Sequence, residues 1–433
     1  MGHEHTAEPR GGERPVRHGR LRRRGTVGPA LSVITTAVVV VLVSTGSVAA
    51  IATWQVLQAA TPTVSLAMPG GRETANAAPE LTAQSGEVNM LLVATDTRDG
   101  QGAGFDDAAN RRASTGVGNN DTNILVHISA DHTNMAVVSF PRDLVLPIPA
   151  CTNDSGAVTP ASSAAMLNTA LGRGGEQHGL ACVASTISRL TGLQIGYAGK
   201  ITFDGVVAMA DAVGGVEVCL ATPIHDDDVT PALDLAAGNR TLSGAEAAAF
   251  LRSRHGVGDD SDLGRISNQQ TFMSALARQA VSAGTLTNPA KVLRLANTAF
   301  RHMTLSDTLS DPGTLARIAL AVNTVGLSNM VFVQYPVVDD PDDSARVLVA
   351  QGAAAQLNGV LQANQAVVLG AGSLGRSAVR DPSASAGPSA AASASASAST
   401  GASVSPGSSA PAAQLPDSVS GQSANTVTCA AKK

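Results

Sequence analysis

An uncharged apolar stretch near the N-terminus places the strongest constraint on this chain. No charged residue occurs between Arg24 and Arg72, and within that interval Val27–Trp54 is rich in Val, Ala, Leu and Ile. A helix of about 20 apolar residues is long enough to cross the hydrocarbon core of a bilayer. We therefore expect residues 29–54 to form one N-terminal transmembrane helix, with Trp54 at the membrane interface.

The charges around this stretch predict its orientation. Arginines crowd its N-terminal side, at Arg10, Arg14, Arg17, Arg20, Arg22, Arg23 and Arg24. Positive residues stay on the cytoplasmic side, so we expect a single-pass cell-membrane protein with a cytoplasmic N-terminus and an extracytoplasmic domain. A cleaved signal peptide is the alternative, although the apolar run is longer than the usual hydrophobic region of such a peptide. A buried core helix would not explain arginines on one side only.

Composition changes along the chain suggest its organisation. The Ala/Ser/Pro bias near the C-terminus gives too little apolar surface to offset the entropy of ordering, so we expect disorder there. We expect a basic cytoplasmic tail at 1–28, the membrane helix at 29–54, a linker at 55–86, an extracytoplasmic catalytic domain at 87–376, and a disordered tail with a terminal cysteine at 377–433.

The overall composition argues against nucleic-acid binding. The net charge is −5 and aromatic residues make up 2% of the chain. A single-stranded nucleic-acid platform stacks bases on aromatic rings and follows the backbone with positive charge. We therefore expect no nucleic-acid partner, and any phosphate chemistry must come from a local cluster.

The cysteines all fall on the expected extracytoplasmic side. An even number in an oxidising compartment indicates disulfides. Three pairings are possible, and we favour Cys151–Cys182 with Cys219–Cys429; free buried thiols are the alternative.

Short apolar runs and helical periodicity alternate through the expected domain, which is typical of an α/β fold. A strand is expected at 88–94, a β-hairpin at 122–129 and 135–140, and a strand–helix–strand unit across 200–220. Further helices are expected near 163–173, 181–191, 289–303, 312–325 and 345–363, with a strand at 329–337. Ser243 and Glu246 form a capping box for the helix that carries Phe250, and Asp262 is expected to cap a second helix that runs to about Ala283.

Charged residues gather where expected strands end and helices begin. Asp96 and Arg98 follow the first strand, Asp121 starts the hairpin, and Arg142 and Asp143 close it. Two carboxylates, together with phosphate oxygens and water, form the ligand set that Mg²⁺ prefers. Arginines beside such an ion would bind a diphosphate through bidentate contacts. Each feature alone has a structural explanation; together they predict a ligand site at the strand ends.

The stretch Phe250–Gln270 adds Arg252, Arg254 and Arg265 to this set. A regular helix would place Arg252 and Arg254 about 200° apart. If both contact one ligand, the chain must leave the helix near His255–Gly256, a turn that Gly256 and Gly258 permit.

Other candidate motifs have simpler interpretations. The glycine-rich Asp99–Asp107 lacks the spacing of a nucleotide-binding loop. The acidic run Asp226–Asp228 is most simply a solvated loop, and His255 a surface histidine.

Several segments together resemble a known family. NMLLVATDTR, DTNILVHISADHTNMAVVSFPRDL, ITFDGVVAMADAVGGVEVCL and LSGAEAAAFLRSRHGVGDDSDLGRISNQQ, in this order, are similar to the LytR–CpsA–Psr family, particularly its actinobacterial branch. The resemblance runs from about Val88 to Arg278. It implies a three-layer α/β/α sandwich whose central mixed sheet helps to enclose a hydrophobic tunnel for a lipid. It also implies an Mg²⁺-dependent phosphotransferase (Mn²⁺ being possible) that moves a glycopolymer from a polyprenyl-diphosphate carrier to peptidoglycan.

The resemblance assigns roles to individual residues. Asp96 and Asp121 match its metal-binding carboxylates. Gln269 belongs to the same motif as the arginines and is expected to bind the diphosphate with them. Asp262 is a candidate catalytic residue beside Arg252, Arg254 and Arg265. The arginines that match diphosphate-contacting positions are Arg98, Arg142, Arg252, Arg254 and Arg265. Two positions depart from the family pattern: Ala94-Thr95 replaces Gly-Ser, and Asn268 replaces a frequent arginine.

Other functions remain open at this point. The same site could hydrolyse lipid diphosphates as a pyrophosphatase, with water as the acceptor. Older names in the family suggest a membrane-bound transcriptional regulator or attenuator, which the expected extracytoplasmic position argues against. A non-catalytic protein that binds the lipid carrier would need the arginines but would not catalyse a reaction.

Overall fold

The computed structural model describes residues 64–66, 83–95, 97, 117–282, 288–370, 372–381 and 413–432. The expected cytoplasmic tail and transmembrane helix lie outside these ranges. Within them, none of the helices combines the length and apolar character that crossing a membrane requires.

A seven-stranded mixed sheet forms the centre of the fold. Its strand order is β13-β8-β1-β2-β3-β14-β20. The predicted hairpin is confirmed, because β2 and β3 pair antiparallel; β8 pairs with β1, and β14 with β3, in parallel. The bounds are β1 Val88–Thr95, β2 Asn120–Ile128, β3 Met135–Phe140, β8 Tyr197–Ile201, β13 Met303–Leu305, β14 Met330–Gln334 and β20 Gly421–Ser423.

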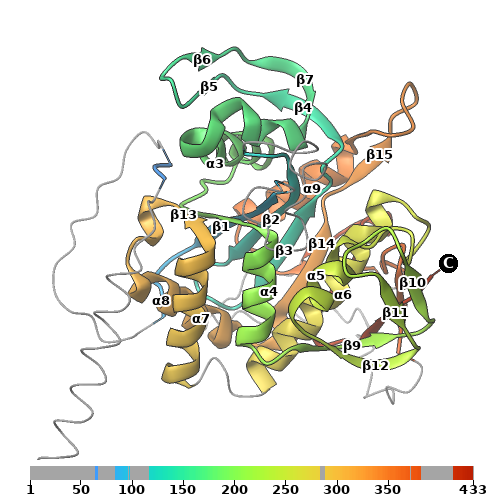
Figure 1. The fold of residues 1–433 in the computed structure, drawn as a ribbon. Coiled ribbons are helices and arrows are strands. Elements are labelled where there is room, and N and C mark those ends of the chain that lie inside the picture. The colour runs from blue at the N-terminus through green and yellow to red at the C-terminus, as the bar shows by residue number, and fades with distance from the viewer. Residues whose placement is uncertain are drawn as a thin grey trace, which may run out of the picture. The chain divides into compact units, whose positions relative to one another are not determined.

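Helices cover both faces of this sheet because its strands are apolar on both sides. Leu91 and Leu125 pack in one core cluster with α3 (Ala170–Thr191) and α9 (Gln351–Gln362). Val126 and Val137 pack in a second cluster with α7 (Pro289–His302) and α8 (Pro312–Val325). In the view of Figure 1, α3 and α9 lie above the sheet and α7 and α8 below it. The described residues therefore form the expected three-layer α/β arrangement.

A smaller layer packs beside the central sheet. The four-stranded sheet β12-β9-β21-β18 shares a core with α5 (Gly244–Arg252) and α6 (Asp262–Ser282), in which Phe250 and Phe272 are buried. Helix α4 (Phe203–Ala212) follows β8, as the strand–helix–strand pattern predicts. The strand bounds are β9 Val216–Leu220, β12 Gly238–Leu242, β18 Ala378–Arg380 and β21 Thr428–Ala430.

The remaining elements are short. A peripheral sheet has the order β15-β16-β4-β7, and three two-stranded ribbons complete the described strands. Their bounds are β4 Leu144–Ile148, β5 Cys151–Thr152, β6 Val158–Thr159, β7 Ser162–Met166, β10 Ile224–Asp226, β11 Leu233–Leu235, β15 Val337–Asp339, β16 Val347–Val349, β17 Val367–Val368 and β19 Ala413–Gln414, with 3₁₀ turns at Leu167–Thr169, Asp307–Leu309 and Leu327–Asn329.

Two predicted helix starts were wrong. Ser162–Met166 is a strand paired with β4, and the helix begins only at Ala170. Val347–Val349 likewise pairs with β4 and β15, so that the last helix starts at Gln351 rather than near 345. In both places, pairing with a distant strand prevails over the local helical pattern.

The expectation of disorder from 377 to 433 was wrong for residues 377–381, which contain β18, and for the C-terminal segment 413–432. This segment adds β20 to the edge of the central sheet, next to β14, and inserts β21 between β9 and β18. Leu415, Val419 and Ala430 are buried. A few apolar residues suffice here because the segment pairs with strands that are already formed.

The favoured disulfide pairing is confirmed. Cys151 is bonded to Cys182 and Cys219 to Cys429, with Cα–Cα distances of 5.5 and 4.4 Å. Cys219 and Cys429 face each other across the parallel pair of β9 and β21. The second disulfide therefore ties the C-terminal segment covalently to the domain.

One buried histidine in β2 makes stability depend on pH. His127 is fully buried, and its Nδ1 lies 2.8 Å from Asn89 Oδ1, while its Nε2 has no hydrogen-bond partner. Asn89 uses its Nδ2 to donate to Gln194 O and Glu87, so its oxygen is the acceptor and His127 Nδ1 carries the proton. Burial lowers the pKa of His127, against the opposing charge of Glu87.

We predict that acid destabilises the native protein partly through His127. Below about pH 6.5, the ordinary pKa of histidine, the unfolded chain binds a proton that the native state does not bind. The free energy of unfolding therefore decreases as the pH is lowered. His127 contributes at most about 1.4 kcal/mol per pH unit to this decrease. Denaturant unfolding between pH 7.5 and 5 should show a shallower decline for His127→Gln. Parallel declines in the two proteins would contradict this.

Candidate functional site

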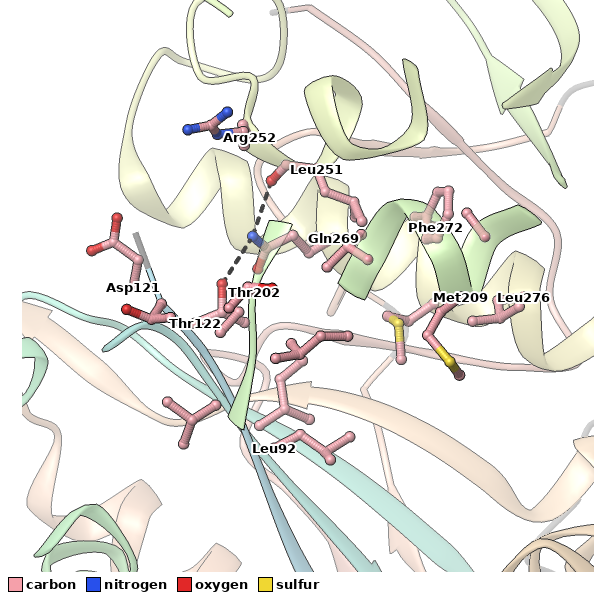
Figure 2. Close-up of a pocket in the computed structure, with 18 of the residues that line it drawn as sticks. Leu92, Asp121, Thr122, Thr202, Met209, Leu251, Arg252, Gln269, Phe272 and Leu276 are labelled. Atoms are coloured by element: carbon pink, nitrogen blue, oxygen red, sulfur yellow. Dashed lines mark hydrogen bonds between the residues drawn. The ribbon is translucent and has the colours of Figure 1, made fainter. Parts of the chain in front are cut away.

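A deep apolar cavity of about 970 Å³ lies between the central sheet and helices α4, α6 and α7. Leu92 of β1, Met209 of α4, and Phe272 and Leu276 of α6 contribute to its wall, as Figure 2 shows. This volume is at the upper end of the range for small-molecule sites. The cavity meets the expectation of a hydrophobic enclosure beside the sheet.

One end of the cavity is polar. In Figure 2, Asp121 and Arg252 lie at that end, away from Met209 and Leu276. The polar groups come from the start of β2, the end of α5, the turn that follows it, and the first turns of α6. They include Asp121, Thr122, Arg252, Arg254, Arg265 and Gln269. The structure thus brings together most of the site residues that were predicted from distant parts of the sequence.

The chain leaves α5 between its two arginines. Helix α5 ends at Arg252, and Ser253 adopts an extended conformation with φ −55° and ψ 132°. Gly258 and Asp260 have positive φ angles of 59° and 62° before α6 begins. We call residues 253–261 the arginine turn. The predicted break between two helices is confirmed, but it begins at Ser253, two residues before His255.

The predicted helix caps need two corrections. Ser243 occupies the N-cap position of α5, but its side chain makes no capping hydrogen bond. At α6, Ser261 Oγ accepts a hydrogen bond from Gly264 N at 3.0 Å, which makes Ser261 the capping residue. Asp262 is instead the first residue of α6, and its carboxylate faces arginines.

Asp262 is the centre of an ion cluster. Its Oδ1 lies 2.6 Å from an Arg265 nitrogen, 3.4 Å from Arg142 Nε and 3.9 Å from an Arg254 nitrogen. Arg142 also contacts Asp121 Oδ1 at 3.0 Å, and Arg265 donates to the backbone oxygen of Asp121, again at 3.0 Å. These contacts connect the start of β2, the end of β3 and the start of α6.

Burial and neighbouring charges shift the pKa values in this cluster. Burial tends to lower the pKa of Arg142, but Asp121, Asp262 and Asp143 together outweigh it and raise the pKa. The pKa of Asp143 is raised, mainly by burial, although Arg142 opposes the shift. The pKa of Arg254 is lowered by burial and by the like charges of Arg265 and Arg142. An anion bound beside Arg254 would relieve that repulsion.

Two amides of α6 hold the end of α5. Asn268 Nδ2 donates to Phe250 O at 2.9 Å, and Gln269 Nε2 donates to Leu251 O at 3.1 Å. These bonds satisfy carbonyls that the last turn of a helix leaves unpaired. Gln269 Nε2 also lies 3.4 Å from Thr122 Oγ1, the second contact drawn in Figure 2. Asn268, the departure from the family pattern, is fully buried and therefore serves helix packing.

Asp96 and Arg98 lie outside the described residues. Strand β1 ends at Thr95, whose register partner in β2 is Asn120. Asp121 therefore follows the position at which β1 ends. The roles predicted for Asp96 and Arg98 stay predictions.

The interpretation of Asp226 as part of a solvated loop was wrong. Asp226 is 3% exposed, at the end of β10. The alternation of Ile224, His225 and Asp226 is the signal that could have shown this, because a strand places the first and third residues on one face. His255 is exposed, as expected, and pairs with Asp228 at 2.7 Å.

Comparison with known proteins identifies the family. The model described as the LytR_cpsA_psr family matches residues 56–363, more than half of the chain. The chain belongs to the LytR_cpsA_psr family.

Similar curated proteins come from several organisms. The cell wall biosynthesis protein LcpA of Corynebacterium glutamicum is 30% identical over 270 residues, covering 59% of this chain and 51% of LcpA. The polyisoprenyl-teichoic acid–peptidoglycan teichoic acid transferase TagU of Oceanobacillus iheyensis is 28% identical over 216 residues, covering 49% and 58%. This LytR_cpsA_psr chain thus spans about half the length of the curated relatives it matches.

A solved structure supports the fold. The crystal structure of protein gbs0355 from Streptococcus agalactiae aligns with a TM-score of 0.50 and 18% identity, covering 64% of this chain and 88% of that one. At this identity, the similarity concerns the mixed α/β fold alone.

We predict that Asp262→Asn strongly destabilises this LytR_cpsA_psr domain. The side chains of Asp262 and Arg265 are 14% and 6% exposed, so removing the shared charge leaves buried guanidinium groups uncompensated. Such a loss costs about 3 kcal/mol or more in the free energy of unfolding. Asp259→Asn is the matched control, because the Asp259–Arg376 pair is half exposed and worth about 1 kcal/mol or less. Equal shifts in denaturant midpoint for the two variants would contradict a central role for Asp262.

Proposed function

We propose that this protein is a phosphotransferase that moves a glycopolymer from a polyprenyl-diphosphate carrier to peptidoglycan. The observation that carries the proposal is an apolar cavity whose wall also includes three arginines, Arg252, Arg254 and Arg265. A prenyl diphosphate has the same division, with an apolar chain and a compact polyanion. Membership of the LytR_cpsA_psr family supports this reading, since a relative carries the name of a teichoic acid transferase.

The arginines suit a diphosphate better than a single phosphate. Arg252 borders the cavity from the end of α5, Arg254 from the arginine turn, and Arg265 from α6. Guanidinium groups approaching from two directions can each bind a different phosphate oxygen, and bidentate pairing fixes the orientation of the group. Arg142, 3.0 Å from Asp121, closes the cluster on the side of the central sheet.

The residues present fit a magnesium ion. Carboxylate oxygens are the ligands that Mg²⁺ prefers. Asp121 supplies one carboxylate at the cavity wall, directly after the register position at which β1 ends. When bound, Mg²⁺ would neutralise charge on the diphosphate oxygens. Asp121 is the described residue we propose to hold it, with Asp96 as the second ligand predicted from sequence; Mn²⁺ would suit the same oxygens.

The reaction requires positioning more than covalent chemistry by the protein. A peptidoglycan hydroxyl attacks the phosphorus on the sugar side of the diphosphate, forming an oxygen–phosphorus bond. The bond to the bridging oxygen breaks, and polyprenyl phosphate leaves with that oxygen. Arg252, Arg254 and Arg265 stabilise the charge that develops on the leaving phosphate. The hydroxyl proton goes to a carboxylate, for which Asp143 and Asp262 are the candidates.

The proposed location follows from the sequence. Residues 29–54 would anchor the protein in the cell membrane, with the cavity on the extracytoplasmic side, where peptidoglycan and its lipid-linked precursors meet. The disulfides Cys151–Cys182 and Cys219–Cys429 support this location, because such bonds persist in oxidising compartments.

We predict that the double variant Arg252→Ala/Arg254→Ala loses transfer activity by at least about 100-fold, the effect of removing one or more charge-stabilising donors. The assay uses a polyprenyl-diphosphate glycopolymer donor with peptidoglycan as acceptor. Arg240→Ala is the matched control, since Arg240 belongs to β12 and donates to the nearby backbone oxygens of Ala236 and Ala237.

Wild-type turnover by the double variant would refute the assignment of the arginines. Release of polyprenyl phosphate at the same rate with and without peptidoglycan would instead identify a pyrophosphatase. Binding of the donor without any turnover in the presence of Mg²⁺ would identify a carrier-binding protein.

A further inference from the structure

Asp226 is a buried acid that the proposed reaction does not use. It is the last residue of β10, and its side chain faces the same way as that of Ile224, while His225 between them is exposed. Asp226 also borders the polar end of the cavity. A carboxylate in such a place needs hydrogen-bond donors to offset its loss of water.

The donors come from the arginine turn and from the neighbouring loop. Asp226 Oδ2 accepts hydrogen bonds from Ser253 Oγ at 2.6 Å and from Gly256 N at 3.3 Å. Asp226 Oδ1 accepts one from Asp228 N at 3.0 Å. Ser253 is completely buried and is the residue at which the chain leaves α5. One carboxylate thus binds the turn at its first and fourth residues.

The contacts of Asp226 with Ser253 and Gly256 lie on either side of Arg254 in the sequence. Ser253 precedes Arg254 directly, and Gly256 follows two residues later, so fixing both leaves the backbone at Arg254 little freedom. The packing is close, because a Cβ atom on Gly256 would lie 2.7 Å from Ile224 Cγ2 and 2.8 Å from Ser253 Oγ. A regular helix would direct Arg254 about 200° away from Arg252. The bonds of Asp226 instead hold a turn in which both arginines border the cavity.

A cation site is a weaker interpretation of the same group. Asp226, Asp228 and His255 lie close enough together to hold an ion. However, Asp226 already accepts three hydrogen bonds from the protein, and His255 Nδ1 already pairs with Asp228 Oδ2 at 2.7 Å. The Asp226 carboxylate and His255 Nδ1 therefore have partners without an ion.

We propose that Asp226 is a positioning residue for diphosphate binding, which it controls by holding Ser253 and Gly256 so that Arg252 and Arg254 face one ligand. This inference rests on the proposed function, because it takes the lipid diphosphate as that ligand. Asp226 itself contacts the turn and not the reacting atoms.

The test compares two probes on the full-length protein in detergent micelles. Geranylgeranyl diphosphate tests the arginines and the apolar cavity together, whereas geranylgeraniol tests the cavity alone. Asp226→Asn keeps the shape of the side chain but replaces one accepting oxygen with an amide N–H₂, which cannot accept the hydrogen bonds that this oxygen accepts. Ser253→Ala removes only the hydrogen bond from Ser253 Oγ. Asp227→Asn is the matched control, since the Asp227 side chain is 74% exposed and pairs with His225.

We expect Asp226→Asn to weaken diphosphate binding by at least about tenfold, and Ser253→Ala to weaken it by a smaller factor. Affinity for the alcohol should stay within about twofold of wild type in both variants, and the control should match wild type for both probes. A variant that merely damaged the domain would lose affinity for the alcohol as well. If Asp226→Asn does not fold, Ser253→Ala still provides the comparison.

Three outcomes would overturn the inference. The first is wild-type diphosphate affinity in both variants. The second is an equal loss of affinity for the two probes. The third is a lower kcat with unchanged diphosphate affinity, which would place Asp226 in the chemical step. If the wild-type protein binds the diphosphate no more tightly than the alcohol, the proposed function fails first and the inference falls with it.

Discussion

Asp262 Oδ1 lies within ion-pair distance of three guanidinium groups, those of Arg265, Arg142 and Arg254. These arginines come from α6, from the end of β3 and from the arginine turn. Arg142 also pairs with Asp121 and Asp143. Burial and the like charges of Arg265 and Arg142 lower the pKa of Arg254. The cluster therefore holds three parts of the chain together, and an anion bound beside Arg254 would relieve the repulsion from Arg265 and Arg142.

The backbone around this cluster is held from both sides. On one side, Asp226 binds Ser253 and Gly256. On the other, Gly258 N donates to Ala431 O at 2.8 Å, next to the strand that Cys429 ties to Cys219. The C-terminal segment 413–432 lies beyond the part of the chain that the family model matches. It nevertheless accepts a hydrogen bond from Gly258 in the arginine turn. The site of this protein therefore depends on residues outside the matched region.

Local pattern was enough to predict much of the fold. The hairpin of β2 and β3, the strand–helix–strand unit around α4 and the break between α5 and α6 all have signals within a few residues. The errors have a common physical cause, which is pairing between distant segments. Ser162–Met166 and Val347–Val349 became strands because β4 was available to both, and residues 413–432 became ordered because β14 and β9 were already in place.

For the candidate site too, residues with a local sequence signal were predicted, and those whose role depends on a distant partner were not. Strand ends and a conspicuous group of arginines led to Asp121, Arg142, Arg252, Arg254 and Arg265, and the structure brings these residues to one cluster. Asp226 was missed, because its importance comes from Ser253, a partner 27 residues away that sequence composition does not reveal. Gln269 was predicted to bind the diphosphate, and in the structure its Nε2 donates to Leu251 O in the last turn of α5. A role in supporting the arginines is compatible with its place in the cavity wall.

The most direct measurement is a structure of the full-length protein with a prenyl diphosphate analogue whose bridging oxygen is replaced by a methylene group. We expect phosphate oxygens at hydrogen-bond distance, about 3 Å, from the guanidinium groups of Arg252 and Arg254. The prenyl chain should run past Leu92 and Met209 into the cavity. Phosphates bound elsewhere, with the prenyl chain outside the cavity, would contradict the central claim that this cavity and these arginines form one site for a lipid diphosphate.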